Sequence, residues 1–203
     1  HFSESLKGDD ASLHKQVEEG KKHFSGIELR GRTLGIIGLG AIGRLVADAA
    51  IGLGMQVMGY DPDITVDAAW GLPSQVKKAH SIEELLRHSD FVSLHIPLLD
   101  ATRGLINAKR VHAMKAGSVM LNFARDAIVE EEAVLAGIAS GHLRGYVCDF
   151  PTNKTQKVPG VIALPHLGAS TLEAEDNCAV MVVDQVRDYL EHGNLANTVN
   201  FPN

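Results

Sequence analysis

The stretch that decides the fold runs from Thr33 to Asp61 and reads TLGIIGLGAIGRLVADAAIGLGMQVMGYD. It begins with an apolar run over 33–39, continues through a glycine-rich turn into a helical pattern, and ends with a second apolar run over 56–60. Strand, helix and strand in this order predict one βαβ unit with its two strands parallel.

The turn Gly38-Leu39-Gly40-Ala41-Ile42-Gly43 has the spacing GxGxxG, and each glycine has its own physical reason. Gly38 permits the tight turn from strand to helix, Gly40 lets the backbone approach a pyrophosphate, and Gly43 lets the helix pack closely on the strand. The free N–H groups of Ala41 and Ile42 lie at the positive end of the helix dipole, where an anion is stabilised. The turn therefore predicts a dinucleotide site.

Asp61 follows Gly43 by 18 residues and ends the second apolar run. A carboxylate at this point can accept hydrogen bonds from an adenosine ribose, and it would repel a 2′-phosphate, so NAD is favoured over NADP. A glycine-rich packing turn in another α/β protein is the alternative, but the strand before the motif and the acid after it favour the dinucleotide.

Composition is that of an ordinary globular domain, with 203 residues, 45% hydrophobic and 22% charged. A net charge of −6 and a pI near 5.9 argue against a nucleic-acid partner or an acidic membrane surface. No apolar run approaches the roughly 20 residues that span a bilayer, and the polar segment 1–22 shows no signal peptide. The sequence also contains no internal repeat.

Cysteine and histidine usage gives further expectations. Cys148 and Cys178 are isolated, without CxxC spacing, which suits a reducing cytoplasm. The ten histidines form no HExxH or similar pair, so we expect no metal.

Strands and helices alternate through the remaining chain. Apolar runs predict further strands over 91–96, 118–123, 146–150 and 161–164, and helical spacing predicts helices over 81–88, 107–114, 129–140 and 171–192, with irregular chain over 61–71. Ser81 and Glu84 form a capping box at the start of one helix. This rhythm predicts an α/β fold, a doubly wound parallel sheet in three α/β/α layers.

Such sheets bind ligands beyond the carboxyl ends of their strands, so the strand ends are where chemistry is expected. Arg125 follows the strand over 118–123, and a guanidinium there can grip the carboxylate of a 2-oxo acid. The alternative is a surface arginine paired with Asp126. His166 follows the last strand and can exchange a proton near neutral pH, although a histidine next to Pro165 can also be structural.

Two more polar residues lie at the same edge. Asp149 could fix the nicotinamide amide or its ring, and the alternative is a helix cap or a loop salt bridge. His95, in His95-Ile96-Pro97, is the weakest of these candidates, because it could simply pack beneath a cofactor.

These residues resemble the NAD-dependent D-2-hydroxyacid dehydrogenases, over about 28–202. The resemblance is carried by LRGRTLGIIGLGAIG, YDP at Asp61, LHIPLLDATRGLI, LNFARDAIVEEEAVL, VCDF and VIALPHLGAST. PHLGAST and the closing NTVNFP are most similar to the branch that oxidises 3-phosphoglycerate to 3-phosphohydroxypyruvate in serine synthesis.

The resemblance implies a role for each site residue. Arg125 would hold the substrate's carboxylate and carbonyl oxygen, and His166 would be the acid/base. Asp61 would bind the ribose, and the amides of Ala41 and Ile42 the pyrophosphate. The remaining cofactor contacts would come from Gly38, Gly40, Gly43, Pro62, His95, Ile96, Pro97, Phe123, Ala124, Asp149, Gly168 and Ala169. A homodimer formed through this domain is also implied.

The chain departs from the family pattern in two ways. Members usually carry a glutamate shortly after the aspartate of the sixth strand, paired with the catalytic histidine, but no acid occurs between Asp149 and His166. We expect either a pH–rate profile displaced to the acid side or a substitute acid from elsewhere. In addition, the family's substrate domain is absent. We expect a linker over 1–26 (or a frayed or tag-derived terminus), a Rossmann domain over 27–192 and an exit segment over 193–203, a unit that binds NAD and turns over poorly alone.

Three rival functions remain open from the sequence. A corepressor of the same fold would bind NAD and serve as an interaction module. A regulatory domain of a transporter or channel would need the glycine turn but not Arg125 and His166. A dehydrogenase for another 2-hydroxy acid would keep all of these residues.

Overall fold

The computed structural model describes residues 2–196 and 198, and its centre is a parallel sheet of seven strands. The strands are β1 (Thr33–Ile37), β2 (Gln56–Tyr60), β3 (Lys77–Lys78), β4 (Phe91–Leu94), β5 (Ser118–Asn122), β6 (Leu143–Cys148) and β7 (Val161–Ala163), in the order β3-β2-β1-β4-β5-β6-β7. This order confirms the predicted doubly wound α/β fold, since the chain winds outward from β1 in both directions.

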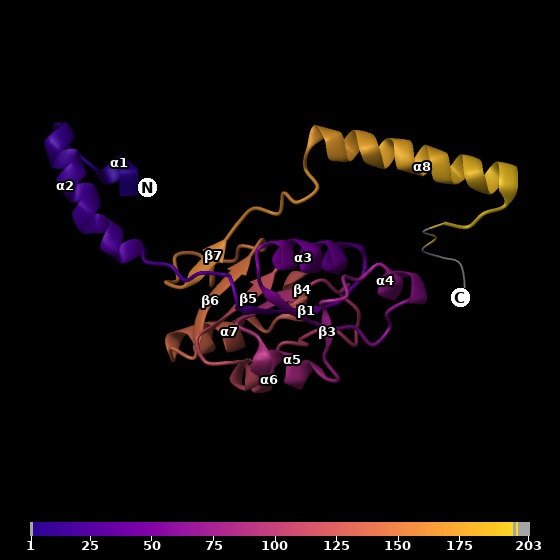
Figure 1. Cartoon of the computed structure of the whole chain (residues 1–203), viewed down its shortest axis with the longest axis horizontal. Helices are drawn as coiled ribbons and strands as arrows, with labels where there is room; N and C mark the ends of the chain where they lie inside the picture. The colour runs from indigo at the N-terminus through magenta and orange to yellow at the C-terminus, as the bar shows by residue number, and fades with distance from the viewer. Residues whose placement is uncertain (1, 197, 199–203) are drawn as a thin grey trace.

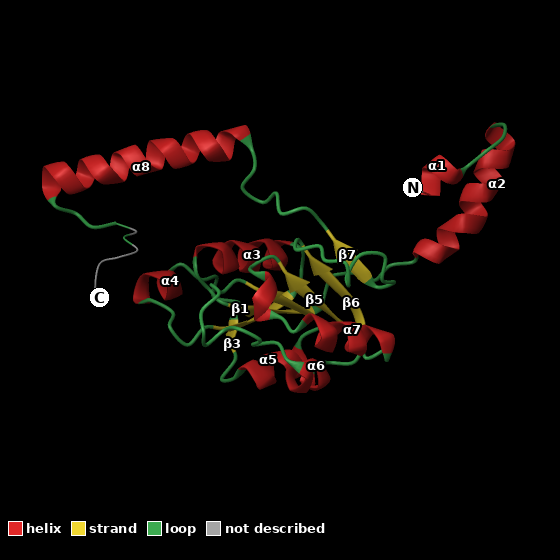
Figure 2. Ribbon diagram, turned by 180° about the vertical axis from the view of Figure 1, so that it is seen from behind, coloured by secondary structure: helices red, strands yellow, loops and turns green. Residues whose placement is uncertain are grey.

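Helices cover both faces of the sheet (Figures 1 and 2). One face carries α3 (Ala41–Gly52), and the other carries α5 (Ile82–His88), α6 (Ala108–Ala113) and α7 (Glu131–Ala139). Each face has its own core. The core between α3 and the sheet contains Ala47 of α3 with Ile36 and Val57 of the sheet. The larger core on the opposite side contains Leu85 and Met120. Burial of such side chains, at roughly 1.5–3 kcal/mol each, drives the layers together.

The register of the central strands brings three loops to one edge. Ile37, the last residue of β1, lies opposite Tyr60 of β2 and Leu94 of β4. The residues that follow these strands therefore meet at the carboxyl edge, at the point where the strand order reverses. That point is the ligand site of doubly wound sheets.

The sequence-based prediction was wrong in two places and differed in one detail. The segment expected to be irregular contains a short helix, α4 (Val66–Trp70), and the two-residue strand β3 was not predicted. Ser81 caps α5 as expected by accepting the Glu84 N–H at 3.1 Å. The Glu84 carboxylate, however, accepts from the N–H of His80 rather than from that of Ser81.

Segments at both ends lie apart from the sheet (Figure 1). The chain begins with α1 (Phe2–Ser5), α2 (Asp10–Gly20) and the short helix η1 (Lys21–Phe24), and α8 (Leu172–His192) follows β7. The predicted long helix over 171–192 is confirmed with Thr171 as its cap, but none of its residues is buried. The NTVNFP segment over 197–202 lies outside the described residues except for residue 198. Within the described part of the chain, no helix has the length and apolarity to cross a bilayer.

Candidate active site

The glycine turn links β1 to α3, and its three glycines meet different surroundings. A Cβ on Gly43 would lie 2.0 Å from the carbonyl oxygen of Gly38, and one on Gly38 would lie 2.4 Å from the carbonyl oxygen of His95. Gly38 also has a φ of 92°, which a side chain would strain. A Cβ on Gly40, by contrast, would meet nothing within 4 Å. The fold therefore requires Gly38 and Gly43, while the space over Gly40 is open to a ligand.

The first turn of α3 faces that open space. Gly40 is the N-cap residue and supplies no side-chain hydrogen bond, and Ala41 and Ile42 are both exposed. Uncapped N–H groups at the start of a helix form an anion site. This geometry fits the pyrophosphate of a dinucleotide.

Asp61 is fastened to the same turn by its carboxylate. Its Oδ2 accepts the Leu39 N–H at 2.8 Å and its Oδ1 accepts the Asp63 N–H at 3.0 Å. The Gly38 N–H donates to the carbonyl oxygen of Tyr60 at 2.9 Å, which joins the two strand ends. A carboxylate oxygen can accept more than one hydrogen bond, so the two backbone bonds leave room for ribose hydroxyls.

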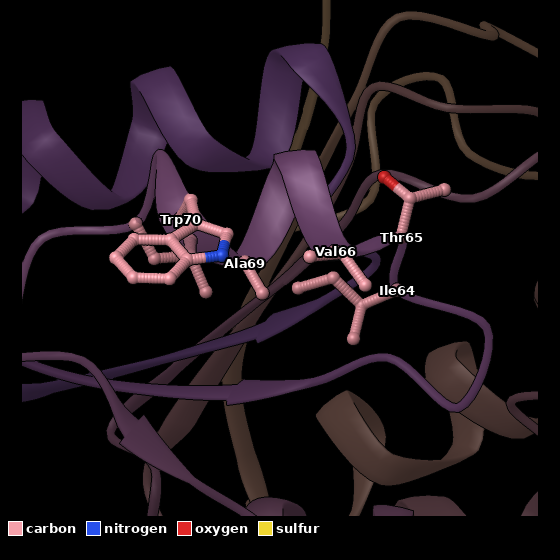
Figure 3. A pocket seen from close by; sticks show the side chains of 6 residues that line it. Ile64, Thr65, Val66, Ala69 and Trp70 are labelled. Atoms are coloured by element: carbon pink, nitrogen blue, oxygen red, sulfur yellow. The ribbon is translucent and has the colours of Figure 1, made fainter.

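Two shallow pockets lie beside Asp61. One, of about 270 Å³, is lined by Leu39, Gly59, Asp61, Ile64, Ala69, Leu72, Val76 and Lys78. The second lies against α4 and shares Ile64, Ala69 and Leu72 with the first; its wall also includes Trp70, of which 85% is exposed (Figure 3). Mostly apolar walls beside a carboxylate that can accept further hydrogen bonds would suit an adenosine. Apart from Asp61, the residues lining these pockets were not predicted as site residues, because α4 and β3 were not predicted.

The loops after β4 and β5 form the middle of the carboxyl edge. His95 is half-buried, and its Nε2 lies 2.9 Å from the Ser93 hydroxyl. Burial lowers the pKa of His95 from its ordinary value, so the ring is held neutral. The backbone carbonyl oxygen of His95 would lie 2.4 Å from a Cβ on Gly38. His95 is thus part of the support beneath the glycine turn.

Arg125 is exposed at the end of β5, and buried Asn122 shapes the loop that carries it. The Asn122 side-chain amide donates to the Arg125 carbonyl at 2.9 Å and its oxygen accepts the Ala124 N–H at 3.2 Å. The guanidinium donates from Nη1 to the Ala124 carbonyl at 2.6 Å. Asp126 instead accepts the Ala127 N–H at 2.7 Å, and within the described residues it forms no ion pair with Arg125. The guanidinium keeps donors available for a carboxylate.

Asp149 and His166 meet at the far end of the edge. The His166 Nδ1 lies 2.7 Å from the Asp149 Oδ2, and the Phe150 ring stacks on the imidazole with centroids 5.0 Å apart. The Asp149 side chain is 9% exposed and that of His166 is 54% exposed. The Asp149 carboxylate therefore contacts the His166 ring in a chain that lacks the glutamate expected of the family. The displaced pH–rate profile and the substitute acid both stay predictions.

The structure places the other predicted residues on the same loops. Ile96 and Pro97 follow His95, Phe123 and Ala124 precede Arg125, and Pro62 follows Asp61. Gly168 and Ala169 are exposed in the segment between β7 and α8. Among the residues the structure describes, no three histidine, cysteine, aspartate or glutamate side chains are grouped as metal ligands would be.

Comparison with known proteins identifies the family. A family model described as D-isomer specific 2-hydroxyacid dehydrogenase, NAD binding domain, matches residues 4–168. The D-3-phosphoglycerate dehydrogenases of Methanocaldococcus jannaschii and Homo sapiens are 37% and 38% identical over 95% and 89% of this chain. The chain spans 37% and 34% of their lengths, about a third of the curated relatives it matches.

Solved structures agree with these sequence relatives. The holo form of D-mandelate dehydrogenase from Rhodotorula graminis has a TM-score of 0.78 at 29% identity, covering 100% of this chain and 61% of that one. An NAD-dependent formate dehydrogenase from Staphylococcus aureus in complex with NAD has a TM-score of 0.72 at 29% identity, covering 91% of this chain and 57% of that one. The sheet order, the glycine turn and the matched family model lead to one conclusion: the chain belongs to the D-isomer specific 2-hydroxyacid dehydrogenases and contains their NAD-binding domain.

Proposed function

We propose that the protein oxidises a D-2-hydroxy acid with NAD, and that the acid is 3-phosphoglycerate, which becomes 3-phosphohydroxypyruvate in the first committed step of serine synthesis. The observation that carries the reaction is the pair of His166 and Asp149, 2.7 Å apart, at the sheet edge that also holds Arg125 and the glycine turn. The substrate rests on the names of the relatives with 36–39% identity.

In this proposal NAD, when bound, supplies the acceptor for the hydride that leaves C2 of the hydroxy acid. The Arg125 guanidinium binds the substrate carboxylate and the C2 oxygen, which orients C2 and stabilises charge that develops on this oxygen. His166 takes the hydroxyl proton at Nε2, because Nδ1 is engaged with Asp149. In the reverse direction the same Nε2 returns the proton to the carbonyl oxygen.

The cofactor contacts follow the edge from one end to the other. The amides of Ala41 and Ile42 receive the pyrophosphate, and Asp61 receives the adenosine ribose. Around them lie the remaining proposed contacts: Gly38, Gly40, Gly43, Pro62, His95, Ile96, Pro97, Phe123, Ala124, Asp149, Gly168 and Ala169. The open space over Gly40 supports this assignment.

The proposal extends to domain organisation, assembly and location. Residues 27–192 form the cofactor domain, joined to a substrate domain through 1–26 and 193–203. The protein is cytoplasmic, and its two free cysteines are consistent with a reducing compartment. It forms a homodimer through this domain. Exposed apolar side chains along α8, with Val182, Val183 and Val186 each more than half exposed, support an association. Light scattering would distinguish the mass of a dimer from that of a monomer.

The test of the function is NADH oxidation by the full-length protein with 3-phosphohydroxypyruvate, pyruvate and hydroxypyruvate in parallel. Turnover confined to the phosphorylated substrate, and lowered roughly 10²- to 10⁴-fold by His166→Ala, is the expected result. Turnover with another 2-oxo acid instead would keep the reaction and replace the substrate. Tight NADH binding with no turnover would favour the NAD-sensing interaction module.

A further inference from the structure

Tyr146 of β6 lies in the core, next to the strand end that carries Arg125. Its side chain is buried and belongs to the core on the side of α5, α6 and α7. In the parallel register Tyr146 lies opposite Met120, and Cys148 lies opposite Asn122. Side chains two residues apart on a strand share a face, so the Tyr146 ring and the Asn122 amide lie on the same face of neighbouring strands. The Tyr146 hydroxyl oxygen is 3.4 Å from the Asn122 Nδ2.

Every polar group of the Asn122 side chain has a partner in this arrangement. Nδ2 donates one N–H to the Arg125 carbonyl at 2.9 Å and the other to the Tyr146 hydroxyl at 3.4 Å, while Oδ1 accepts the Ala124 N–H at 3.2 Å. Asn122 is fully buried, so the second N–H would have no acceptor without the hydroxyl. A buried donor without an acceptor is costly, and the amide would then gain by rotating toward another acceptor. The hydroxyl therefore strengthens the preference of Asn122 for the orientation that holds the loop.

The Tyr146 hydroxyl is also neutral. Burial raises the pKa of this hydroxyl from its ordinary value, and the hydrogen bond from Asn122 has a smaller, opposite effect. A neutral hydroxyl oxygen can accept an N–H as a carboxylate does. It does so without adding a negative charge, which would compete with a substrate carboxylate for the Arg125 guanidinium.

Arg125 is tied to the Asn122 amide through its own backbone. The Arg125 carbonyl accepts the Asn122 N–H at 2.9 Å and the Ile128 N–H at 3.4 Å, at the start of the short helix η2 (Asp126–Ile128). The guanidinium donates to the carbonyl of Ala124, whose N–H is held by Asn122. The place of the guanidinium thus depends on where Asn122 holds the loop. A small displacement of a group that orients a substrate can lower turnover strongly.

We propose that Tyr146 is a positioning residue that orients the Arg125 guanidinium through Asn122. This inference rests on the proposed function, in which Arg125 binds the substrate carboxylate, and it adds a core residue that contacts neither substrate nor cofactor. Tyr146→Phe removes the hydroxyl and keeps the ring in the core. It should therefore weaken the use of the substrate and leave the binding of the cofactor unchanged.

The first arm of the test observes the Asn122 side-chain amide by its ¹H–¹⁵N resonances on the 203-residue chain. In Tyr146→Phe the amide proton that faces the hydroxyl in wild type should shift upfield, because it loses its acceptor. The backbone amide resonances of Ala124 and Arg125 should shift with it, because both residues are held by the same side chain. Unchanged resonances in Tyr146→Phe would overturn the proposal.

The second arm measures steady-state kinetics of the full-length protein with the 2-oxo acid that it reduces fastest. Tyr146→Phe should lower kcat/KM roughly three- to tenfold, as expected for the loss of one net hydrogen bond, with the Kd of NADH unchanged. The decrease should vanish in the Arg125→Gln background, because a hydroxyl that acts only through Arg125 then has nothing to orient. An equal decrease in both backgrounds, or a parallel weakening of NADH binding, would indicate a general loss of packing and overturn the proposal.

Tyr189→Phe is the matched control, because it removes the same hydroxyl from a tyrosine that is 54% exposed on α8, apart from the sheet. It should leave the amide resonances and the kinetics as in wild type. Wild type without turnover of any 2-oxo acid would refute the proposed function, while shifted resonances would still support the contact from Tyr146 to the Arg125 loop. Turnover with an unaltered kcat/KM in Tyr146→Phe would refute the positioning role and keep the dehydrogenase.

Discussion

Asp61 and Asp149 each follow a strand at the carboxyl edge of the sheet, but their carboxylates have different partners. Both oxygens of Asp61 accept backbone N–H groups, from Leu39 and from Asp63. One oxygen of Asp149 binds the ring of His166 and the other has no described partner. At the proposed nucleotide end the carboxylate is thus held by backbone N–H groups. At the proposed catalytic end the carboxylate is held by a side chain, and one of its oxygens has no donor among the described residues.

This difference separates hydrogen bonds that stabilise the folded chain from acceptor atoms that stay free for a ligand. A carboxylate whose oxygens both accept backbone N–H groups stabilises its own loop before any ligand binds. A buried oxygen without a donor destabilises the free protein slightly and gains its partner on binding. Substitutions at the two ends should therefore separate effects on folding from effects on binding and turnover.

Among the substitutions that compare the two ends, the largest effect is expected at the proposed catalytic end, from Arg125→Gln. The guanidinium is exposed, and among the described residues its one hydrogen bond is to the Ala124 carbonyl, so the fold should tolerate its loss. Loss of the fork that grips a carboxylate should lower kcat/KM of the full-length protein roughly 10²- to 10³-fold. The free energy of unfolding should change by less than about 0.5 kcal/mol. Steady-state kinetics and urea unfolding measure the two quantities.

Arg125→Lys is the matched variant, since it keeps the charge and loses the planar fork. It should recover only part of the lost kcat/KM. Full activity in Arg125→Gln would remove Arg125 from the site and leave the strand end as a surface loop.

Substitutions in the glycine turn should give the next largest effects, and here one of them, Gly43→Ala, should lower the free energy of unfolding. A Cβ on Gly43 would lie 2.0 Å from a backbone oxygen that cannot move aside easily, so Gly43→Ala should cost about 3 kcal/mol of the free energy of unfolding. Gly40→Ala places its methyl group in open space and should change that free energy by less than about 0.5 kcal/mol. NADH affinity, measured by fluorescence, should fall roughly tenfold or more in Gly40→Ala, because the methyl group occupies the pyrophosphate position.

Each of the two glycine variants serves as the control experiment for the other. If Gly40→Ala bound NADH like wild type, the open space above the turn would not be the pyrophosphate site. If Gly43→Ala were as stable as wild type, α3 could move away from the turn far enough to accommodate a methyl group at little cost in free energy.

A smaller effect separates the two aspartates directly. Asp61→Ala leaves the N–H groups of Leu39 and Asp63 without their acceptor and should lower the free energy of unfolding by about 1–2 kcal/mol. Asp149→Ala removes one buried oxygen without a described partner and one hydrogen bond to the half-exposed His166 ring, so the two effects offset each other and it should lower the free energy of unfolding by less than Asp61→Ala does. Thermal and urea unfolding of the two variants side by side would test this. Equal destabilisation by both would contradict the distinction between a satisfied and an open carboxylate.

The geometry of the glycine turn and of Asp61 could be predicted from the sequence better than the contact between Asp149 and His166, for a physical reason. Glycine spacing and the position of Asp61 are set by the backbone path of a βαβ unit, which local sequence determines. The pairing of Asp149 with His166 depends on the register of β6 against β7, where Cys148 lies opposite Ala163. That register brings an acid one residue past one strand to a histidine three residues past the other. No local pattern encodes it.

The elements around the adenosine pocket were missed for a similar reason. β3 consists of Lys77 and Lys78, both exposed, so it has no apolar alternation to detect. α4 spans five residues, and none of its described side chains belongs to either core. Such short elements are specified by their neighbours in the sheet, and the pocket beside Asp61 is invisible without them.

The smallest expected effect concerns His95, which lies beneath the glycine turn between the two ends of the edge. Because burial lowers the pKa of His95, the unfolded chain binds a proton more readily than the native protein as the pH falls through the ordinary histidine pKa of about 6.5. The contribution of the neutral ring to stability is fully present above this range and declines below it, until the native ring is also protonated. Urea unfolding between about pH 7.5 and pH 5.5 should therefore show a free energy of unfolding that decreases with falling pH.

His95→Gln removes the titrating ring, so its unfolding free energy should fall less steeply over the same range, by at most about 1.4 kcal/mol per pH unit relative to wild type. His192→Gln on α8, outside the core, provides the baseline for a histidine-to-glutamine change. Parallel curves for wild type and His95→Gln would mean that the ring accepts a proton in place. His95 would then not be held neutral by its burial beneath the glycine turn.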